Sequence, residues 1–119
     1  MSILGIDHVQ VAAPPGCEKA ARAFYGGLLE LDELPKPELL EARGGCWFRA
    51  GAQELHVGVE DPFAPARKAH PSLLVSDLAA LGKRLRGAGF EVVPDDEIPG
   101  VERAYIDDPF GNRLELRQA

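Results

Sequence analysis

The sequence has 119 residues, of which 45% are hydrophobic and 27% charged, and this composition predicts one globular domain with a buried core. Its formal net charge of −6 and its pI near 5.0 exclude the basic surfaces that bind nucleic acids or anionic membranes. A start without a signal-peptide pattern, the lack of an apolar run of membrane-spanning length, and only two cysteines indicate a cytoplasmic protein.

The first half of the chain predicts a strand, a helix and then further strands. Residues 5–13 alternate as a strand does, and residues 17–31 carry an apolar stripe at helical spacing. Residues 32–45 are charged and broken by proline, which predicts a weak edge strand or a loop. Residues 46–60 contain two strand patterns around a short Gly-Ala turn, and we expect a hairpin there.

The second half shows the same order after a linker. Residues 61–69 contain two prolines and no periodicity, so we expect a linker. Residues 70–77 predict a strand that ends on good helix N-caps, and residues 78–89 predict a helix closed by glycine. Residues 90–100 predict a strand that leads into an acidic loop, and residues 101–118 predict the closing hairpin.

This repetition predicts two modules that stack on each other. Module one spans about 3–61 and module two about 69–118. A repeat of this length usually forms a unit that cannot bury its apolar face alone. An unrepeated α+β sandwich with coincidental spacing is the alternative.

Strand parity separates two faces in each predicted strand, because successive side chains point to opposite sides of a sheet. The aliphatic residues of each strand share one face, which we expect to pack under the helices. The three histidines of the chain and one glutamate all lie on the opposite face. The aliphatic residues are Val9, Val11, Leu55, Val57, Val59, Leu73, Val75, Leu114 and Leu116, and the residues opposite them are His8, His56, His70 and Glu115.

Three imidazoles and a carboxylate suit a borderline divalent metal such as Fe, Mn, Co, Ni or Zn. Two histidines and one carboxylate would leave coordination positions open for a substrate, as a catalytic metal requires. A single strand histidine is more often a surface or hydrogen-bonded residue, and Glu115 alone is more often a solvated charge. Strand parity does not show that the four side chains converge.

Three further polar residues are candidates for contact with a substrate. Gln10 and Ser72 share the predicted metal-facing side of their strands, where they would orient a ligand or the substrate. Arg103 would meet an anionic group of the substrate. Ordinary surface polarity is an equally good explanation of Gln10 and Ser72, and a solvated loop arginine is the simpler explanation of Arg103.

The sequence resembles the vicinal-oxygen-chelate superfamily, whose fold glyoxalases, bleomycin-resistance proteins and extradiol dioxygenases share. The resemblance covers essentially the whole chain. It implies an α+β fold in which two βαβββ modules form a cupped, partly closed barrel-like sheet around one metal, as a single glyoxalase-like domain over residues 1–119. It rests on the segments IDHVQVAA, FYGGLLEL, ELHVGVEDP, AHPSLLVSD and YIDDPFGNRLEL.

The resemblance also implies a ligand set, with His8 on the first strand, His56 on the fourth, His70 on the fifth and Glu115 on the eighth. In glyoxalase I the fourth-strand position is a glutamate that binds metal and moves the substrate proton. His56 departs from that pattern, which disfavours a true glyoxalase I. We expect His56 and Glu115 to be the catalytic residues, with His56 either a fourth ligand or the base.

The expected function is therefore that of a metal-dependent enzyme acting on a small molecule. A divalent ion would chelate two neighbouring oxygens of the substrate in lyase, isomerase, thiol transferase or dioxygenase chemistry. Superfamily proteins of this size usually form homodimers, often with sites shared between chains. The alternatives are a bleomycin-resistance-like binding protein without catalysis and, less favoured, a structural or regulatory domain.

Overall fold

The computed structural model describes every residue from 1 to 119 and divides into two compact units, Met1–Ala64 and Pro65–Ala119. The division falls inside the predicted linker 61–69. Each unit carries one four-stranded mixed sheet and follows the order strand, helix, three strands, apart from one short extra helix. This confirms the α+β class and the two βαβββ modules. Each sheet is open, and no closed barrel is formed.

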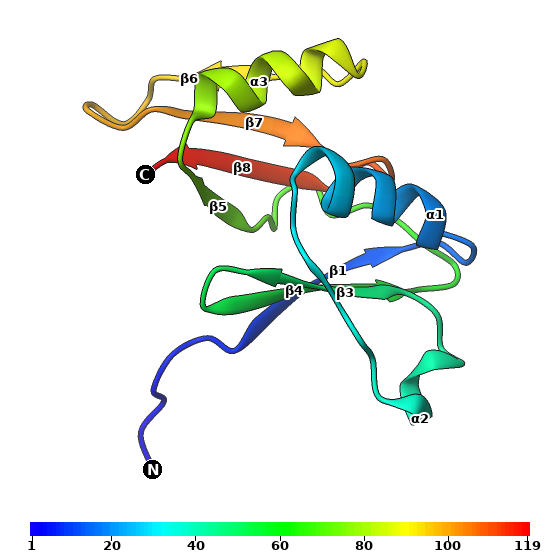
Figure 1. Cartoon of the computed structure of the whole chain (residues 1–119). Helices are drawn as coiled ribbons and strands as arrows, with labels where there is room; N and C mark the ends of the chain where they lie inside the picture. The colour runs from blue at the N-terminus through cyan, green and yellow to red at the C-terminus, as the bar shows by residue number, and fades with distance from the viewer. The chain divides into compact units, whose positions relative to one another are not determined.

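The first unit has a sheet with the strand order β1-β4-β3-β2, in which β1 is parallel to β4 and the other neighbours are antiparallel. The predicted helix forms in two parts, because a bond from the Leu29 amide to the Phe24 carbonyl widens its end into a π-helix. The elements are β1 (His8–Ala13), α1 (Glu18–Ala21), the π-helical η1 (Arg22–Leu28), β2 (Glu33–Leu34), α2 (Glu38–Glu41), β3 (Cys46–Ala50) and β4 (Gln53–Val59) (Figure 1).

The region 32–45 contains both the expected edge strand and a helical turn that the proline pattern did not predict. The strand β2 is only two residues long, and α2 begins directly after Pro37. Proline at a helix start has its φ angle already set for the helix, and Glu and Leu at the following positions are good helix formers. A single helical turn therefore fits after Pro35 and Pro37 and before Gly44 and Gly45.

The second unit repeats the arrangement with the strand order β5-β8-β7-β6, in which β5 is parallel to β8. Asp77 caps its helix by accepting a hydrogen bond from the Ala80 amide at 3.0 Å. The final turn is closed by Asp108, whose Oδ1 accepts from two backbone amides at 2.9 Å. The elements are β5 (Ser72–Val75), α3 (Leu78–Gly87), β6 (Val93–Asp95), β7 (Arg103–Asp107) and β8 (Arg113–Gln118) (Figure 1).

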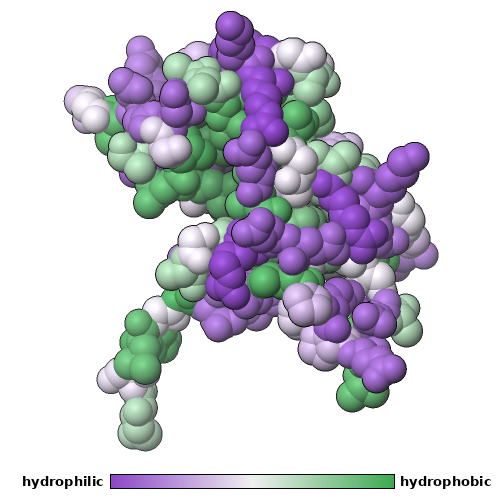
Figure 2. Space-filling model, viewed as in Figure 1, coloured by the Kyte–Doolittle hydropathy of each residue, from purple (hydrophilic) through white to green (hydrophobic).

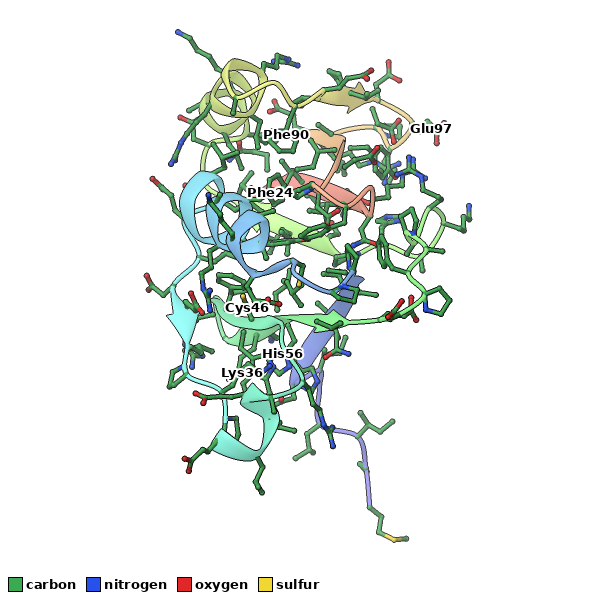
Figure 3. All side chains as sticks on the ribbon, turned by 90° about the vertical axis from the view of Figure 1, so that its right-hand side faces the viewer. Phe24, Lys36, Cys46, His56, Phe90 and Glu97 are labelled. Atoms are coloured by element: carbon green, nitrogen blue, oxygen red, sulfur yellow. The ribbon has the colours of Figure 1, made fainter.

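The apolar face of each sheet is buried, as the parity argument predicted for the central strands. Val9 is an exception, because 37% of it is exposed at the start of β1, and Val59, Leu73 and Val75 are only partly buried. In Figure 3, Phe24 of η1 lies on one side of β4 and His56 on the other. The fully or almost fully buried apolar strand residues are Val11, Ala13, Cys46, Phe48, Leu55, Val57, Ala104, Ile106, Leu114 and Leu116.

The residues that directly precede β1 and β5 do not form strands. His70 does not lie within β5, because the strand begins at Ser72, so the expectation that all three histidines sit on strands is wrong for this one. Residues 1–7 extend from the start of β1 and expose Ile3, Leu4 and Ile6 (Figures 1 and 2). The helices of the structure are all too short or too polar to cross a bilayer.

Candidate functional site

The polar face of the first sheet holds a stack of three aromatic rings. His56 lies between Trp47 and His8, with ring centroids 4.1 Å away on each side. The Trp47 ring is tilted by only 6° and the His8 ring by 15° relative to His56. The stack follows from the register, because Trp47 of β3 is the direct cross-strand partner of His56 in β4. His56 is buried by this arrangement, with 5% of its surface exposed.

A carboxylate fixes the orientation of the His56 ring. His56 Nε2 lies 2.9 Å from Glu54 Oε1, two residues earlier on the same face of β4. Donation from Nε2 to the carboxylate leaves Nδ1 as the proton-accepting nitrogen. Arg49 lies 3.8 Å from the other oxygen of Glu54.

The stacked arrangement bears directly on whether His8 and His56 share a metal. Imidazole lone pairs lie in the plane of the ring, and these two planes are nearly parallel at a centroid distance of 4.1 Å. Both lone pairs then cannot point to one ion at the usual distance of about 2.0–2.1 Å. In the stacked geometry, at most one of the two rings can bind a given ion.

Gln10 lies beside this stack but leans along the sheet. It is the cross-strand partner of His56 in the register of β1 and β4. Its amide group sits over Gly58, where an added Cβ would come within 2.7 Å of the Gln10 side chain. Gly58 therefore leaves the space that the Gln10 side chain occupies.

The polar face of the second sheet is built around Glu115. This carboxylate is 3% exposed, and its Oε1 lies 3.2 Å from His70 Nε2 and 3.4 Å from Arg103 Nη1. Its Oε2 lies 3.2 Å from Arg117 Nη2. Ser72, its cross-strand partner in β5, also donates a hydrogen bond to it. Glu115 is thus in contact with three other predicted site residues, His70, Ser72 and Arg103.

These contacts keep Glu115 ionised. Burial alone would raise the pKa of its carboxyl group, because it penalises the charged form. The hydrogen bonds from His70, Ser72 and Arg117, together with the charge of Arg103, outweigh burial and lower that pKa below its ordinary value. Glu115 is therefore a carboxylate with a negative charge ready for a cation.

Arg103 is held in place but is not fully satisfied. Its Nη2 pairs with Asp95 Oδ2 at 2.5 Å, and Asp95 is its cross-strand partner in β6. The Arg103 side chain is only 11% exposed, and its Nε is buried without a hydrogen-bond partner. A buried donor without a hydrogen-bond partner costs about 1–3 kcal/mol of free energy. A ligand oxygen that accepted a hydrogen bond from Nε would recover that cost.

The donor chemistry of the histidines fits a metal. A metal-binding imidazole usually donates from its second nitrogen to a carboxylate or a backbone carbonyl. His8 Nδ1 lies 2.9 Å from Asp7 Oδ2, His56 Nε2 lies 2.9 Å from Glu54 Oε1, and His70 Nδ1 lies 2.9 Å from the Lys68 carbonyl. His8 and His56 keep their other nitrogen for an ion, whereas the other nitrogen of His70, Nε2, lies 3.2 Å from Glu115 Oε1. Neither unit by itself gathers three or more histidine, cysteine, aspartate or glutamate side chains at one point.

The structure thus places the predicted ligands in two pairs. His8 contacts His56 in the first unit, and His70 contacts Glu115 in the second. Sequence analysis missed the residues that surround these pairs. The signal was present, because Glu54 and Arg117 each stand two residues from a predicted ligand and share its strand face. Trp47 and Tyr105 are cross-strand partners, and only the register identifies them.

A cavity of about 570 Å³ in the second unit meets these contacts only at Arg103 and its partner Asp95. It is lined by α3 and the segment 94–104. Arg103 alone of the predicted site residues borders it. The polar sheet face, which carries the donor atoms, is therefore the better candidate for chemistry.

Solved structures resemble the chain along its whole length. A glyoxalase family protein from Bacillus anthracis is 52% identical, with a TM-score of 0.95, and the match covers 99% of this chain and 97% of that one. Lactoylglutathione lyase from Agrobacterium tumefaciens is 21% identical, with a TM-score of 0.75 and coverage of 100% and 96%. The fosfomycin resistance protein FosX from Listeria monocytogenes is 14% identical, with a TM-score of 0.79 and coverage of 99% and 95%. No protein-family model and no curated protein matches the sequence.

Proposed function

The chain belongs to the glyoxalase family of the vicinal-oxygen-chelate superfamily, and on that premise we propose that it is a metal-dependent enzyme acting on a small oxygenated molecule. The observation that carries the proposal is the Glu115 cluster. A buried, ionised carboxylate contacts an imidazole whose other nitrogen is already bound to a backbone carbonyl. That is the outer bonding expected of a histidine and a carboxylate that bind metal together.

We propose that the two pairs serve one divalent ion, within one chain or across two chains. His8, His70 and Glu115 are the ligands in this proposal. Because stacked rings cannot both bind one ion, His56 takes a different role in it. The ion would supply Lewis-acid stabilisation of the negative charge that develops on neighbouring substrate oxygens. Ser72 donates a hydrogen bond to Glu115 and holds its carboxylate in one orientation, which a ligand needs. His70 Nε2, 3.2 Å from Glu115 Oε1, would bind the ion in place of that contact.

His56 takes the role of the base in this proposal. Its Nε2 donates to Glu54, so Nδ1 accepts the proton of the substrate and Glu54 stabilises the imidazolium that results. The flanking rings of Trp47 and His8 exclude water from both faces of the imidazole. Gln10, next to His56 in the register, is placed to orient a substrate.

The metal content of protein purified without chelators or a histidine tag tests the proposal. Mass spectrometry of the elements should find close to one Fe, Mn, Co, Ni or Zn per chain in the wild type. His8→Ala and Glu115→Ala should lose most of it, while Glu91→Ala, which removes an exposed carboxylate, should retain it. Equal metal content in all four proteins would show that these residues are not ligands.

We also propose that the protein forms a homodimer whose sites take residues from both chains. His8→Ala and Glu115→Ala remove ligands from different units, so mixing the two variants under exchange conditions should restore some complete sites. Recovery of metal binding in the mixture, with a dimer by light scattering, would support shared sites. A monomer in solution would contradict them.

A ligand-binding protein without catalysis is the second candidate. The stack of Trp47, His56 and His8 favours it, because a flat aromatic cation could add to such a platform. In that case protein without metal should bind the cation, and His8→Ala should weaken the binding by removing an outer ring. Binding of the cation that required metal would favour the enzyme instead.

A further inference from the structure

The polar face of the second sheet carries more positive charge than the predicted ligand set requires. Arg113 and Arg117 flank Glu115 in β8, two residues to either side, so their side chains leave the same face of the strand. Arg103 is the cross-strand partner of Arg117. Three guanidinium groups thus lie along the two central strands of this sheet.

The carboxylates of this face do not balance these cations. Asp95 pairs with Arg103, and Glu115 accepts from Arg103 and Arg117. Asp107, the cross-strand partner of Arg113, is paired with a fourth arginine, Arg67, at 2.9 Å. Three arginines therefore share two carboxylates, which leaves one positive charge in excess. This excess stands out in a chain whose formal net charge is −6.

Arg113 is the guanidinium without a carboxylate partner. Its Cζ lies 3.9 Å from the centroid of the Tyr105 ring, and Arg103 Cζ lies 5.4 Å from the same ring. The His70 ring meets Tyr105 edge-on, with centroids 5.4 Å apart. Tyr105 is in turn the cross-strand partner of Glu115. The ring gathers Arg103, Arg113 and His70 beside the carboxylate and keeps the planar fork of Arg113 available for an acceptor.

We propose that Arg113 and Arg117, with Arg103, bind an oxyanion group of the substrate, either a carboxylate or a phosphoryl group. The inference rests on the proposed function in treating the bound anion as part of the substrate. Guanidinium groups match such groups with two parallel hydrogen bonds. The buried Arg103 Nε without a partner gives a second, independent sign of a missing acceptor.

A metal ion at Glu115 would increase the need for an anion at this site. Glu115 would give part of its negative charge to the ion, and the arginines that now contact it would lose an acceptor. Because a divalent cation and three guanidiniums repel one another, an anionic substrate group is the simplest way to balance the site. The substrate class is thus a small anion that also carries the oxygens for the metal.

Calorimetric titration of metal-free protein with inorganic phosphate, and separately with acetate, tests the inference at constant ionic strength. Binding to the wild type should weaken about tenfold in Arg113→Gln and in Arg117→Gln, since each removes a charge-assisted hydrogen bond. Arg43→Gln makes the same charge change at an exposed position of the first unit and should bind as the wild type does. Tighter binding of phosphate would indicate a phosphoryl group on the substrate, and tighter binding of acetate would indicate a carboxylate.

Two further proteins keep the test decisive. Arg113→Lys retains the charge and loses the fork, so it should bind less tightly than the wild type even if Arg113→Gln does not fold. His8→Ala should bind phosphate normally in the metal-free state, which separates the anion site from the metal site. If the protein as purified contains no metal but binds phosphate, the proposed metal-dependent enzyme is wrong and the arginine site stands. If the wild type does not bind phosphate, or if all variants bind it equally, the inference is overturned.

Discussion

The two units share one scaffold but carry different chemistry on their polar sheet faces. In the first unit, His56 lies between Gln10 and Trp47 in the register, and Glu54 stands two residues before it. In the second unit, Glu115 lies between Ser72 and Tyr105, and Arg113 stands two residues before it. An imidazole flanked by a carboxylate in one unit thus corresponds to a carboxylate flanked by guanidiniums in the other.

The apolar faces of the central strands show no such divergence. Every register position that is buried on the core side of β3 and β4 has a buried counterpart in β7 and β8. Core packing constrains the size and shape of a side chain, whereas a polar face is constrained only by what it binds. The repeat therefore preserves the packing of the apolar face, and function changes on the polar face. The matching pairs are Cys46 and Ala104, Phe48 and Ile106, Leu55 and Leu114, and Val57 and Leu116.

The equivalence of the apolar faces predicts the largest effect. Leu55 and Leu114 are both fully buried, so Leu55→Ala and Leu114→Ala should each lower the free energy of unfolding by about 2–5 kcal/mol. Urea denaturation of the two variants and the wild type measures this. If one variant lost stability and the other did not, the cores of the two units would not be equivalent.

The difference between the two carboxylates predicts a smaller effect. Glu115→Gln should lower the free energy of unfolding by about 1–3 kcal/mol, because Arg117 loses its charged partner while Arg103 keeps Asp95. Glu54→Gln should lower it by less than about 1 kcal/mol, since the Glu54 side chain is 29% exposed and its amide can still accept from His56.

The effect of Glu115 should depend on pH. Its pKa is lowered in the folded protein from the ordinary value of 4.5, so its contribution is complete above that value and is lost as pH falls through the lower, folded one. The stability gap between the wild type and Glu115→Gln should therefore narrow in acid. A gap that widens as pH falls from about 5 to 3 would contradict the lowered pKa.

The aromatic stack predicts the smallest effect and offers a convenient signal. Trp47 is the only tryptophan of the chain, so its fluorescence reports on the ring that covers it. His56→Ala removes that ring and should shift the Trp47 emission maximum to longer wavelength, because water reaches the uncovered face of the indole. His56→Phe keeps a ring in the stack and should leave the emission maximum nearly unchanged, at a cost of about 1 kcal/mol for the lost bond to Glu54.

The same experiment separates the two histidines of the stack. His8→Ala removes the ring on the far side of His56 and should leave the Trp47 emission maximum close to that of the wild type. If His56→Ala kept the wild-type emission spectrum, His56 would not be the ring that covers the indole.

Much of the fold could be predicted from the sequence, because alternation and helical spacing record burial directly. The strands, both main helices, the linker and the final turn all carried such a local signal. The turn α2 did not, because a single helical turn has no periodicity. His70 was placed on a strand because its parity matched that of Ser72, although backbone pairing begins only at Ser72.

Less of the candidate site could be predicted in this way. Parity assigned His8, Gln10, His56, Ser72 and Glu115 to polar faces, but it gives no information on which strands are neighbours. The parallel pairing of β1 with β4 and of β5 with β8 joins residues far apart in the sequence. Contacts such as Trp47 on His56 and Arg113 on Tyr105 depend on that pairing and on side-chain rotamers, which the sequence pattern does not encode.

Cobalt titration of metal-free protein, followed by visible absorption, tests most directly whether ligands from both units serve one ion. The wild type should bind one Co²⁺ per chain with a single spectrum, and both His8→Ala and Glu115→Ala should abolish that spectrum. Either variant binding Co²⁺ with the affinity and spectrum of the wild type would contradict the shared site.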